Sequence, residues 1–156
     1  MDRLDALNQV AEFHRTFKHP VLPEPTIPAP ERCQLRVSLL AEELDELRAA
    51  IEDQDIVEIA DALCDLQYVL AGAVLEFGLG EKFRTLFDEV QRSNMSKTCV
   101  SEAEAKATQQ HYFEKDGTES YIHQAGDKWL VYRTSDNKTL KSINYSPADL
   151  KSILGK

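Results

Sequence analysis

Two long stretches with the apolar spacing of α-helices follow one another with only a few residues between them. The first covers residues 30–52 and the second residues 55–77. In both stretches apolar residues recur at intervals of three and four, which places them on one face of a helix. Because so short a connection leaves the chain little freedom, we expect the two helices to pack antiparallel. This packing would fix the face that each helix shows the other.

Two shorter helical patterns flank this pair. Residues 4–18 carry one apolar stripe, and a proline-rich connector at residues 20–30 separates them from the first long helix. Proline supplies no amide donor and favours extended backbone, so this connector should be stiff and not helical. Residues 80–93 form the other pattern, after a helix end marked by glycine. The sequence therefore predicts a mainly α fold, with four helices bundled in a domain of residues 1–100.

The chain changes character after the fourth helix. Residues 101–110 are polar and helical in part, and two runs of aromatic and β-branched residues, TESYIHQ and KWLVYRT, flank a turn at residues 125–127. We expect a hairpin there, within a two- or three-stranded sheet, and a short helix after Pro147. Residues 101–156 are thus predicted to form a C-terminal extension with a small β-sheet and a closing helix.

Several residue types that often serve chemistry favour structural roles in this chain. The three cysteines are widely spaced and lack a Cys/His ligand pattern, which indicates reduced thiols. Of the four scattered histidines none is assigned to metal, and His14 and His19 are interpreted as packing or turn residues. The aromatic side chains of the C-terminal extension are expected to form the hairpin's own small core: Phe113, Tyr121, Trp129 and Tyr132.

Charge and hydropathy narrow the class of partner. The net charge of −9 argues against binding of nucleic acid through its phosphates, because such binding depends on Lys and Arg patches. The sequence has no stretch near the roughly 18 uninterrupted apolar residues of a membrane span, and its start, MDRLDALNQV, lacks the features of a signal peptide. We expect a cytoplasmic protein without nucleic-acid or membrane partners, whose phosphorylated ligands need metal ions to screen the charge.

Acidic residues recur at helical spacing on both long helices. On the first, Glu42 and Glu43 each lie one turn from Glu46, and on the second Glu58 lies one turn before Asp61. Facing helices would bring at least four carboxylates together, where repulsion and burial are unfavourable unless a cation neutralises them. Hard oxygen ligands with no histidine nearby favour magnesium or manganese over zinc.

A solvated acidic face is the competing interpretation of these carboxylates. Asp61 and Asp65 interrupt a helix whose other residues are largely hydrophobic, and a purely solvated location is less natural there. If the acidic face is only solvated, or only binds a metal ion that stabilises the fold, the chain is a non-catalytic nucleotide-binding or assembly module. A metal phosphohydrolase acting on cyclic or monoester phosphates is a third hypothesis.

The acidic strings, EExxE at residues 42–46 and ExxD at residues 58–61, resemble the paired motif of the all-α NTP pyrophosphohydrolase superfamily. This superfamily includes MazG, dimeric dUTPases and phosphoribosyl-ATP pyrophosphohydrolase. The string RSNMSK is similar to that of a bacterial and phage branch, and LKSINYSP is similar to the closing element of the same branch. The resemblance covers roughly residues 1–100 and 140–150 and implies a four-helix MazG-like bundle.

The resemblance also implies an activity. It is magnesium-dependent hydrolysis of a nucleoside triphosphate, or of a phosphoribosyl-ATP-like nucleotide, between the α- and β-phosphates, which gives the monophosphate and pyrophosphate. The implied magnesium ligands, with manganese as an alternative metal, are Glu43, Glu46, Glu58 and Asp61. Glu42 is left to orient or deprotonate water, in a reaction that depends mainly on positioning and electrostatics. A homodimer or homotetramer is implied as well, because a lone four-helix unit leaves an apolar face uncovered.

A triphosphate also needs cationic and hydrogen-bonding partners. The residues in the two further strings are Lys97 and Lys141 for phosphates, Asn94 and Asn144 for a base or sugar, and Tyr145 for stacking on a base. Arg92 is a further candidate for a phosphate contact. Taken singly, such residues are also common as surface lysines and turn asparagines. Spacing alone does not indicate which base or sugar is bound.

Overall fold

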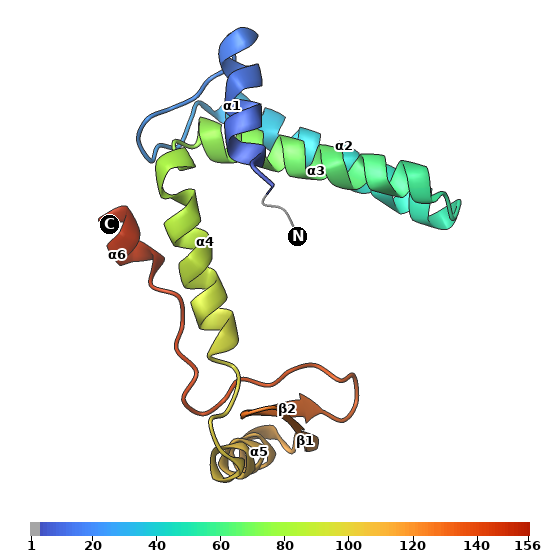
Figure 1. Ribbon diagram of the computed structural model, residues 1–156, viewed down its shortest axis with the longest axis vertical. Coiled ribbons are helices and arrows are strands. Elements are labelled where there is room, and N and C mark those ends of the chain that lie inside the picture. Colours follow the sequence, from blue (N-terminus) through green and yellow to red (C-terminus); the bar gives the residue numbers. More distant parts are fainter. Residues whose placement is uncertain (1–3) are drawn as a thin grey trace. The chain divides into compact units, whose positions relative to one another are not determined.

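The computed structural model of the protein describes residues 4–156, and these residues form six helices and two strands (Figure 1). The fold is mainly helical with a small antiparallel hairpin near the C-terminus, as predicted. The chain forms two compact units, residues 1–84 and residues 85–156. Each is described by itself below. The predicted domain boundary after residue 100 stays a prediction.

Three helices build the first unit: α1 (Ala6–Thr16), α2 (Pro30–Glu52) and α3 (Ile56–Glu76). Both α1 and α2 pack against α3, and Figure 1 shows α2 and α3 side by side along their length. Only three residues connect the two long helices, so they run antiparallel as the sequence predicts. A small apolar cluster joins α1 to the C-terminal half of α3 and contains Val10, Ala11, Ala71 and Leu75.

The ends of the two long helices follow from particular residues. Pro30 occupies the first turn of α2, where its missing amide is harmless and its fixed φ suits a helix. Asp55 caps α3, because its carboxylate accepts hydrogen bonds from the backbone amides of Val57, at 2.9 Å, and Glu58, at 3.3 Å. The cap fixes where α3 begins, and with it the positions of the acidic residues one turn further on.

The proline-rich connector is fixed against the end of α3. The amide of Leu22 donates to the carbonyl of Leu75 at 3.0 Å, and the amide of Thr26 donates to that of Phe77 at 3.0 Å. Gly78 has a φ of +66°, and a Cβ built on it would lie 1.9 Å from the carbonyl oxygen of Glu24. Only glycine fits this backbone approach.

A buried ionic network also lies in the first unit. Glu76, only 1% exposed, receives hydrogen bonds from Arg32 and Arg36 of α2. Burial raises the pKa of Glu76, but the two arginines outweigh it and hold that pKa below its usual value. His14 is buried too, with Nδ1 2.8 Å from the carbonyl of Pro20, which confirms its predicted packing role.

The second unit begins within α4 (Gly80–Met95), which starts in the first unit. It continues with α5 (Glu102–Asp116), β1 (Ser120–Ala125), β2 (Lys128–Arg133) and the short α6 (Leu150–Leu154). β1 and β2 are antiparallel, with Ser120 opposite Arg133 and Ala125 opposite Lys128. Along its other edge, β2 exchanges two backbone hydrogen bonds with Cys99 and accepts one from Leu140. These are isolated contacts, so the described residues form a two-stranded sheet and no third strand.

Helix α5 is longer than the sequence pattern predicts. It extends to Asp116 because Gly117, with a φ of +72°, supplies the left-handed residue that ends it. The side that faces the sheet carries the small residues Ala105 and Thr108, which are buried, so no broad apolar stripe marks the helix. The core of this unit is also small and consists of Cys99, Ala105, Val131 and Leu140.

The predicted aromatic core of the hairpin is only partly present. Trp129 packs against the core of the second unit, and the rings of Tyr121 and Tyr132 lie 5.5 Å apart. Phe113 is 58% exposed and does not belong to this core. Tyr112, at the neighbouring position on α5, packs against the core instead.

All three cysteines have free thiols. No single helix among residues 4–156 has the length and apolarity to cross a membrane, although α3 and α4 taken together meet that test as a bent pair.

Candidate functional site

The acidic residues predicted as a metal site lie on α2 and α3. Glu42, Glu43 and Glu46 occupy the second half of α2, and Glu58 and Asp61 occupy the first turns of α3. Glu43 is half-buried and the other four are exposed. Because α2 and α3 are antiparallel neighbours, these two stretches lie alongside each other.

The electrostatics of Glu43 show that carboxylates from both helices lie near one another. The pKa of Glu43 is raised, first by burial and then by neighbouring negative charges. These charges belong to Glu46, Asp65, Glu42 and Asp61. Asp65 was left out of the predicted ligands, although its place one turn after Asp61 was a usable signal. Glu58 is not among these charges, and its role stays a prediction.

The donor set fits a hard divalent cation in its chemistry, because carboxylate oxygens are the ligands that Mg²⁺ prefers. The side chains are not gathered around a common point, however. Within residues 4–156, no group of three or more His, Cys, Asp and Glu side chains is placed to hold a metal ion. The exposed carboxylates would therefore have to reorient to coordinate one.

A second set of candidates meets in the second unit, around the ring of Tyr145. The Tyr145 hydroxyl lies 3.1 Å from Ser93 Oγ on α4, and Lys141 Nζ lies 4.3 Å from the ring centroid. The pKa of Tyr145 is lowered, first by the hydrogen bond with Ser93 and then by nearby positive charges. These charges belong to Lys141, Lys97 and Arg92. The structure thus brings RSNMSK and LKSINYSP together.

Two cations, Arg92 in the last turn of α4 and Lys97 just after this helix, differ in their availability. Lys97 Nζ donates to Asn94 Oδ1 at 2.8 Å and has no carboxylate partner within residues 4–156. Arg92 pairs with Glu89 at 2.8 Å and also donates to the carbonyl of Pro147 at 3.0 Å. Arg92 therefore anchors residues 140–147, here called the closing segment, and its charge is largely neutralised. This makes it a weaker phosphate contact than Lys97.

Glu104 holds the closing segment from the other side. Its carboxylate accepts hydrogen bonds from Ser142 Oγ and, at 3.0 Å, from the amide of Val100. Burial raises the pKa of Glu104, but these hydrogen bonds and one from Asn144 outweigh it, so that the pKa is lowered. From the sequence, Glu104 was assigned no functional role. Its contact with Ser142 joins residues 38 positions apart, which no local pattern reveals.

Asn144 is thereby engaged inside the protein. Its backbone amide donates to Ser142 Oγ at 3.0 Å, and its side chain hydrogen-bonds Glu104. The predicted contact between Asn144 and a base or sugar thus competes with an internal one. Tyr145, with its ring stacked on Lys141, has a similar internal partner.

The first unit thus combines a helical hairpin with carboxylates on the neighbouring stretches of α2 and α3, which is the architecture of the all-α NTP pyrophosphohydrolases. The chain belongs to the phosphoribosyl-ATP pyrophosphohydrolase family, whose model matches residues 10–94. This match contains all five acidic candidates. The chain is also similar to an uncharacterized protein of Acanthamoeba polyphaga mimivirus, with 23% identity over 93% of this chain and 94% of that protein. Membership of the family indicates a nucleotide pyrophosphohydrolase.

Proposed function

We propose that the protein hydrolyses a nucleoside triphosphate, or a phosphoribosyl-ATP-like nucleotide, between the α- and β-phosphates and releases the monophosphate and pyrophosphate. The observation that carries the proposal is the convergence of carboxylates from α2 and α3 on Glu43, whose pKa is raised by burial and then by these neighbouring charges. Such a concentration of negative charge is unfavourable for a protein alone. It is expected where a cation or a positively charged complex is to be bound.

Glu43, Glu46, Glu58 and Asp61 are proposed to hold Mg²⁺, with Mn²⁺ as an alternative. The surrounding charges include Asp65, which we add as a candidate. Bound magnesium supplies neutralisation of the phosphate oxygens and of the leaving pyrophosphate. Because most of these side chains are exposed, they can reorient from their present positions without disturbing the helix packing.

Glu42 is proposed to orient or deprotonate the attacking water. It lies next to Glu43 on α2, is exposed, and its charge acts on Glu43. A carboxylate within hydrogen-bond reach of a water can act as its general base. In the second unit, Lys97 and Lys141 are proposed to contact phosphate oxygens, with Asn94, Asn144 and Tyr145 as further nucleotide contacts.

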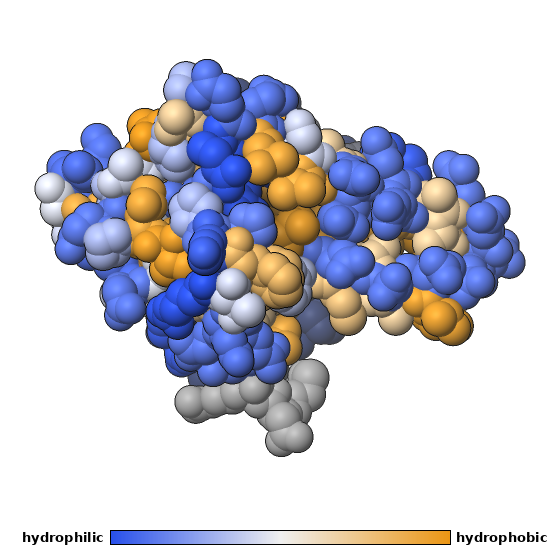
Figure 2. All heavy atoms as spheres, turned by 90° about the horizontal axis from the view of Figure 1, so that it is seen from above, coloured by the Kyte–Doolittle hydropathy of each residue, from blue (hydrophilic) through white to orange (hydrophobic). Residues whose placement is uncertain are grey.

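We further propose that the protein acts as a homodimer or as a tetramer of dimers. Two rows of exposed apolar residues support this, one on each long helix. They recur at intervals of seven residues, the spacing of helices that pack on other helices. The rows are Val37, Leu44 and Ile51 on α2, and Ile56, Leu63 and Leu70 on α3. Figure 2 shows such hydrophobic side chains among hydrophilic ones on the α2–α3 hairpin.

The test is release of pyrophosphate from a panel of canonical, deoxy- and modified nucleoside triphosphates and phosphoribosyl-ATP. Each reaction is run with Mg²⁺, with Mn²⁺ and with EDTA. We expect release from at least one substrate that EDTA abolishes and that Glu43→Ala removes. Glu31→Ala, an exposed glutamate at the other end of α2, is the matched control and should leave the rate unchanged.

Glu42→Gln separates the proposed base from the ligands. We expect this variant to lower kcat by about 10²–10⁴ and to leave magnesium-dependent nucleotide binding largely intact. Loss of binding together with activity would count against the base role. If no substrate releases pyrophosphate although magnesium raises the melting temperature, the chain is a metal-stabilised binding or assembly module. Release of orthophosphate alone would indicate another kind of phosphohydrolase.

A further inference from the structure

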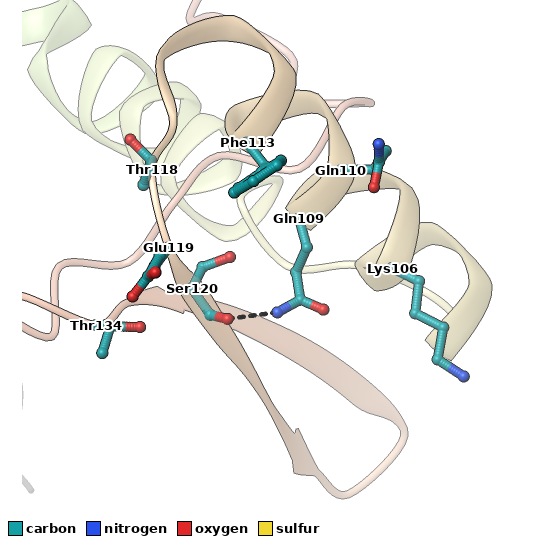
Figure 3. Close-up of a pocket in the computed structure, with 8 residues that line it drawn as sticks. All are labelled: Lys106, Gln109, Gln110, Phe113, Thr118, Glu119, Ser120 and Thr134. Carbon is teal, nitrogen blue, oxygen red and sulfur yellow. Dashed lines mark hydrogen bonds between the residues drawn. The ribbon is translucent and has the colours of Figure 1, made fainter.

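A pocket of about 530 Å³ opens in the second unit between α5 and the start of β1 (Figure 3). Its walls are side chains of α5, the connection from α5 to β1, and the residue that follows β2. A volume of this size is ordinary for the site of a small organic ligand. None of the residues that line it was assigned a role in nucleotide hydrolysis.

The pocket lies on a different side of α5 from the cluster around Tyr145. Glu104 and Thr108, one turn apart on α5, contact the closing segment at Ser142 and Ile143. Gln109 and Phe113 are also one turn apart, but they line the pocket instead. Helical spacing points these two pairs in different directions. The pocket is therefore separate from the proposed phosphate contacts.

One polar atom in the pocket has no partner. Ser120 Oγ is buried and makes no hydrogen bond within residues 4–156. The carbonyl of the same residue is satisfied, because Gln109 Nε2 donates to it at 2.6 Å. Figure 3 shows the Ser120 hydroxyl on the side of the strand that faces α5 and Phe113. A buried hydroxyl without a partner is unfavourable, so a hydrogen-bonding group in the pocket would stabilise it.

An apolar surface stands beside this hydroxyl. The ring of Phe113 lines the pocket, and 58% of the residue is exposed although the neighbouring Tyr112 packs into the core. An exposed aromatic ring next to an unsatisfied hydroxyl suits a flat ligand that stacks by its face and hydrogen-bonds by its edge.

The charges around the pocket select against an anion. Lys106 is neutralised by Glu102, with Nζ 2.6 Å from Oε1, and Glu119 adds a carboxylate to the lining. The other polar groups of the lining are uncharged amides and hydroxyls. A phosphate would find no unpaired cation among the lining residues. A neutral ring with polar edges is the chemistry that fits.

We propose that this pocket binds a nucleoside without its phosphates, with the base stacked on Phe113 and its polar edge hydrogen-bonded to the Ser120 hydroxyl and the Gln109 amide. Gln109 can take part because only its nitrogen is engaged within residues 4–156, which leaves the amide oxygen to accept. The site is distinct from the proposed hydrolytic site and needs no metal. It would give the C-terminal extension a ligand of its own.

The test uses the full chain, labelled with ¹⁵N, in EDTA, so that metal-dependent nucleotide binding does not contribute. Adenosine and uridine are titrated while backbone amide shifts are followed. We expect saturable shifts at Gln109, Phe113 and Ser120 for at least one of the two nucleosides. Phe113→Ala should weaken binding by about tenfold or more, because stacking on an aromatic ring is lost.

Two further variants make the result specific. Phe17→Ala is the matched control, since Phe17 is similarly exposed, at 60%, but is the C-cap residue of α1 in the first unit. This variant should bind the nucleoside as the unsubstituted chain does. Ser120→Ala should weaken binding by about threefold to tenfold through the lost hydrogen bond. Both Phe113 and Phe17 are exposed, so neither substitution should unfold the protein, and the dispersion of the amide spectrum verifies this.

The proposal is overturned if neither nucleoside causes saturable shifts. It is also overturned if Phe113→Ala and Ser120→Ala both bind the nucleoside as tightly as the unsubstituted chain does. It is also overturned if methyl glucoside saturates the pocket and the nucleosides do not, because the site would then recognise a sugar. Since EDTA is present throughout, any of these failures leaves the proposed pyrophosphohydrolase activity untouched.

Discussion

Glu76 illustrates at the residue scale how the first unit handles a buried charge. Its carboxylate lies at the end of α3 and binds Arg32 and Arg36 from α2, so one side chain ties the two long helices together. A buried ion pair adds little over an apolar pair of similar shape, but removal of one partner leaves the others buried and uncompensated. The network thus specifies how α2 and α3 pair more than it adds to stability.

Glu76→Gln should accordingly destabilise the protein by about 3 kcal/mol, because two arginines lose their counter-charge. The measurement is the free energy of unfolding in urea. Glu81→Gln, an exposed glutamate in the first turn of α4, is the control and should stay within about 0.5 kcal/mol of the unsubstituted chain.

The same network predicts a pH dependence. The pKa of Glu76 in the folded protein lies below its ordinary value of 4.5, so the folded state favours the ionised form more than the unfolded state does. Its contribution is therefore complete above about pH 4.5 and is lost as the pH falls through the lowered folded pKa. Urea unfolding between pH 6 and pH 3 should show this loss, and Glu76→Gln should show less of it.

Glu104 is the corresponding residue of the second unit. Its two carboxylate oxygens hold Ser142 and the amide of Val100, and Ser142 lies beside Lys141 in the closing segment. Glu104→Ala should release this segment and cost about 1–3 kcal/mol, because the hydroxyl of the buried Ser142 loses its acceptor. Once this segment is released, Tyr145 is no longer held near Ser93 of α4 and the neighbouring positive charges. Its pKa should then rise toward its ordinary value of 10.

Absorbance titration of tyrosine measures this rise. Glu102→Ala, which breaks only the exposed pair with Lys106, is the control and should leave the Tyr145 titration unchanged. A Glu104→Ala variant that is destabilised but keeps the lowered Tyr145 pKa would mean that the carboxylate supports the fold without positioning the closing segment.

At the scale of elements, the end of α3 depends on one glycine. Gly78→Ala would place a Cβ 1.9 Å from the Glu24 carbonyl oxygen at a φ of +66°, so the connector would have to move. We expect a loss of about 3 kcal/mol or more in the free energy of unfolding. Gly117→Ala is the matched control, since its φ of +72° is similar but no atom lies within 4 Å of the added Cβ.

Gly117→Ala should cost only about 1–2 kcal/mol, the strain of a left-handed residue without a clash. Thermal and urea unfolding of the two variants isolate the contribution of the backbone contact. Equal losses in the two variants would show that the connector yields easily and does not hold the end of α3.

Elements with a strong periodic signal were predictable from the sequence. The bounds of α2 and the cap at Asp55 follow from apolar spacing, an N-terminal proline and a capping carboxylate, all of which act within a few residues. The full length of α5 was not predictable, because its buried side is formed by small residues such as Ala105. The exposure of Phe113 was also missed, since the choice between two neighbouring aromatic residues depends on packing against distant chain.

The candidate site divides in the same way. Carboxylates on α2 and α3 could be placed from helical spacing, because the short connection fixes how the two helices face each other. Asp65 was noted among the acidic residues of the second long helix but was not included among the predicted ligands. The partners of Glu104 and Asn144 could not be found, because they join segments far apart in the sequence by side-chain hydrogen bonds.

At the scale of the whole molecule, the chain consists of two units with small cores. The first has a cluster of four buried residues joining α1 to α3, while much of the apolar surface of α2 and α3 is exposed. Exposed apolar rows of this length on antiparallel helices are unfavourable in a monomer and are ordinary in a helical interface. The family match ends at residue 94, so the interface we propose lies within the family's region and not in the C-terminal extension.

Val37→Asp tests this interface away from the acidic cluster. Val37 is 61% exposed, so a charge there does not disturb the core of a monomer, but it would be desolvated in an interface between copies. We expect the unsubstituted chain to have two or four times the 17.7 kDa mass of one copy, and Val37→Asp to shift it toward the monomer. Val100→Asp, at an 81% exposed valine in the second unit, should leave the mass unchanged. Light scattering coupled to size exclusion measures all three. A chain that elutes as a monomer at high concentration, or a dimer that Val37→Asp does not weaken, would mean that this row is not the contact between copies.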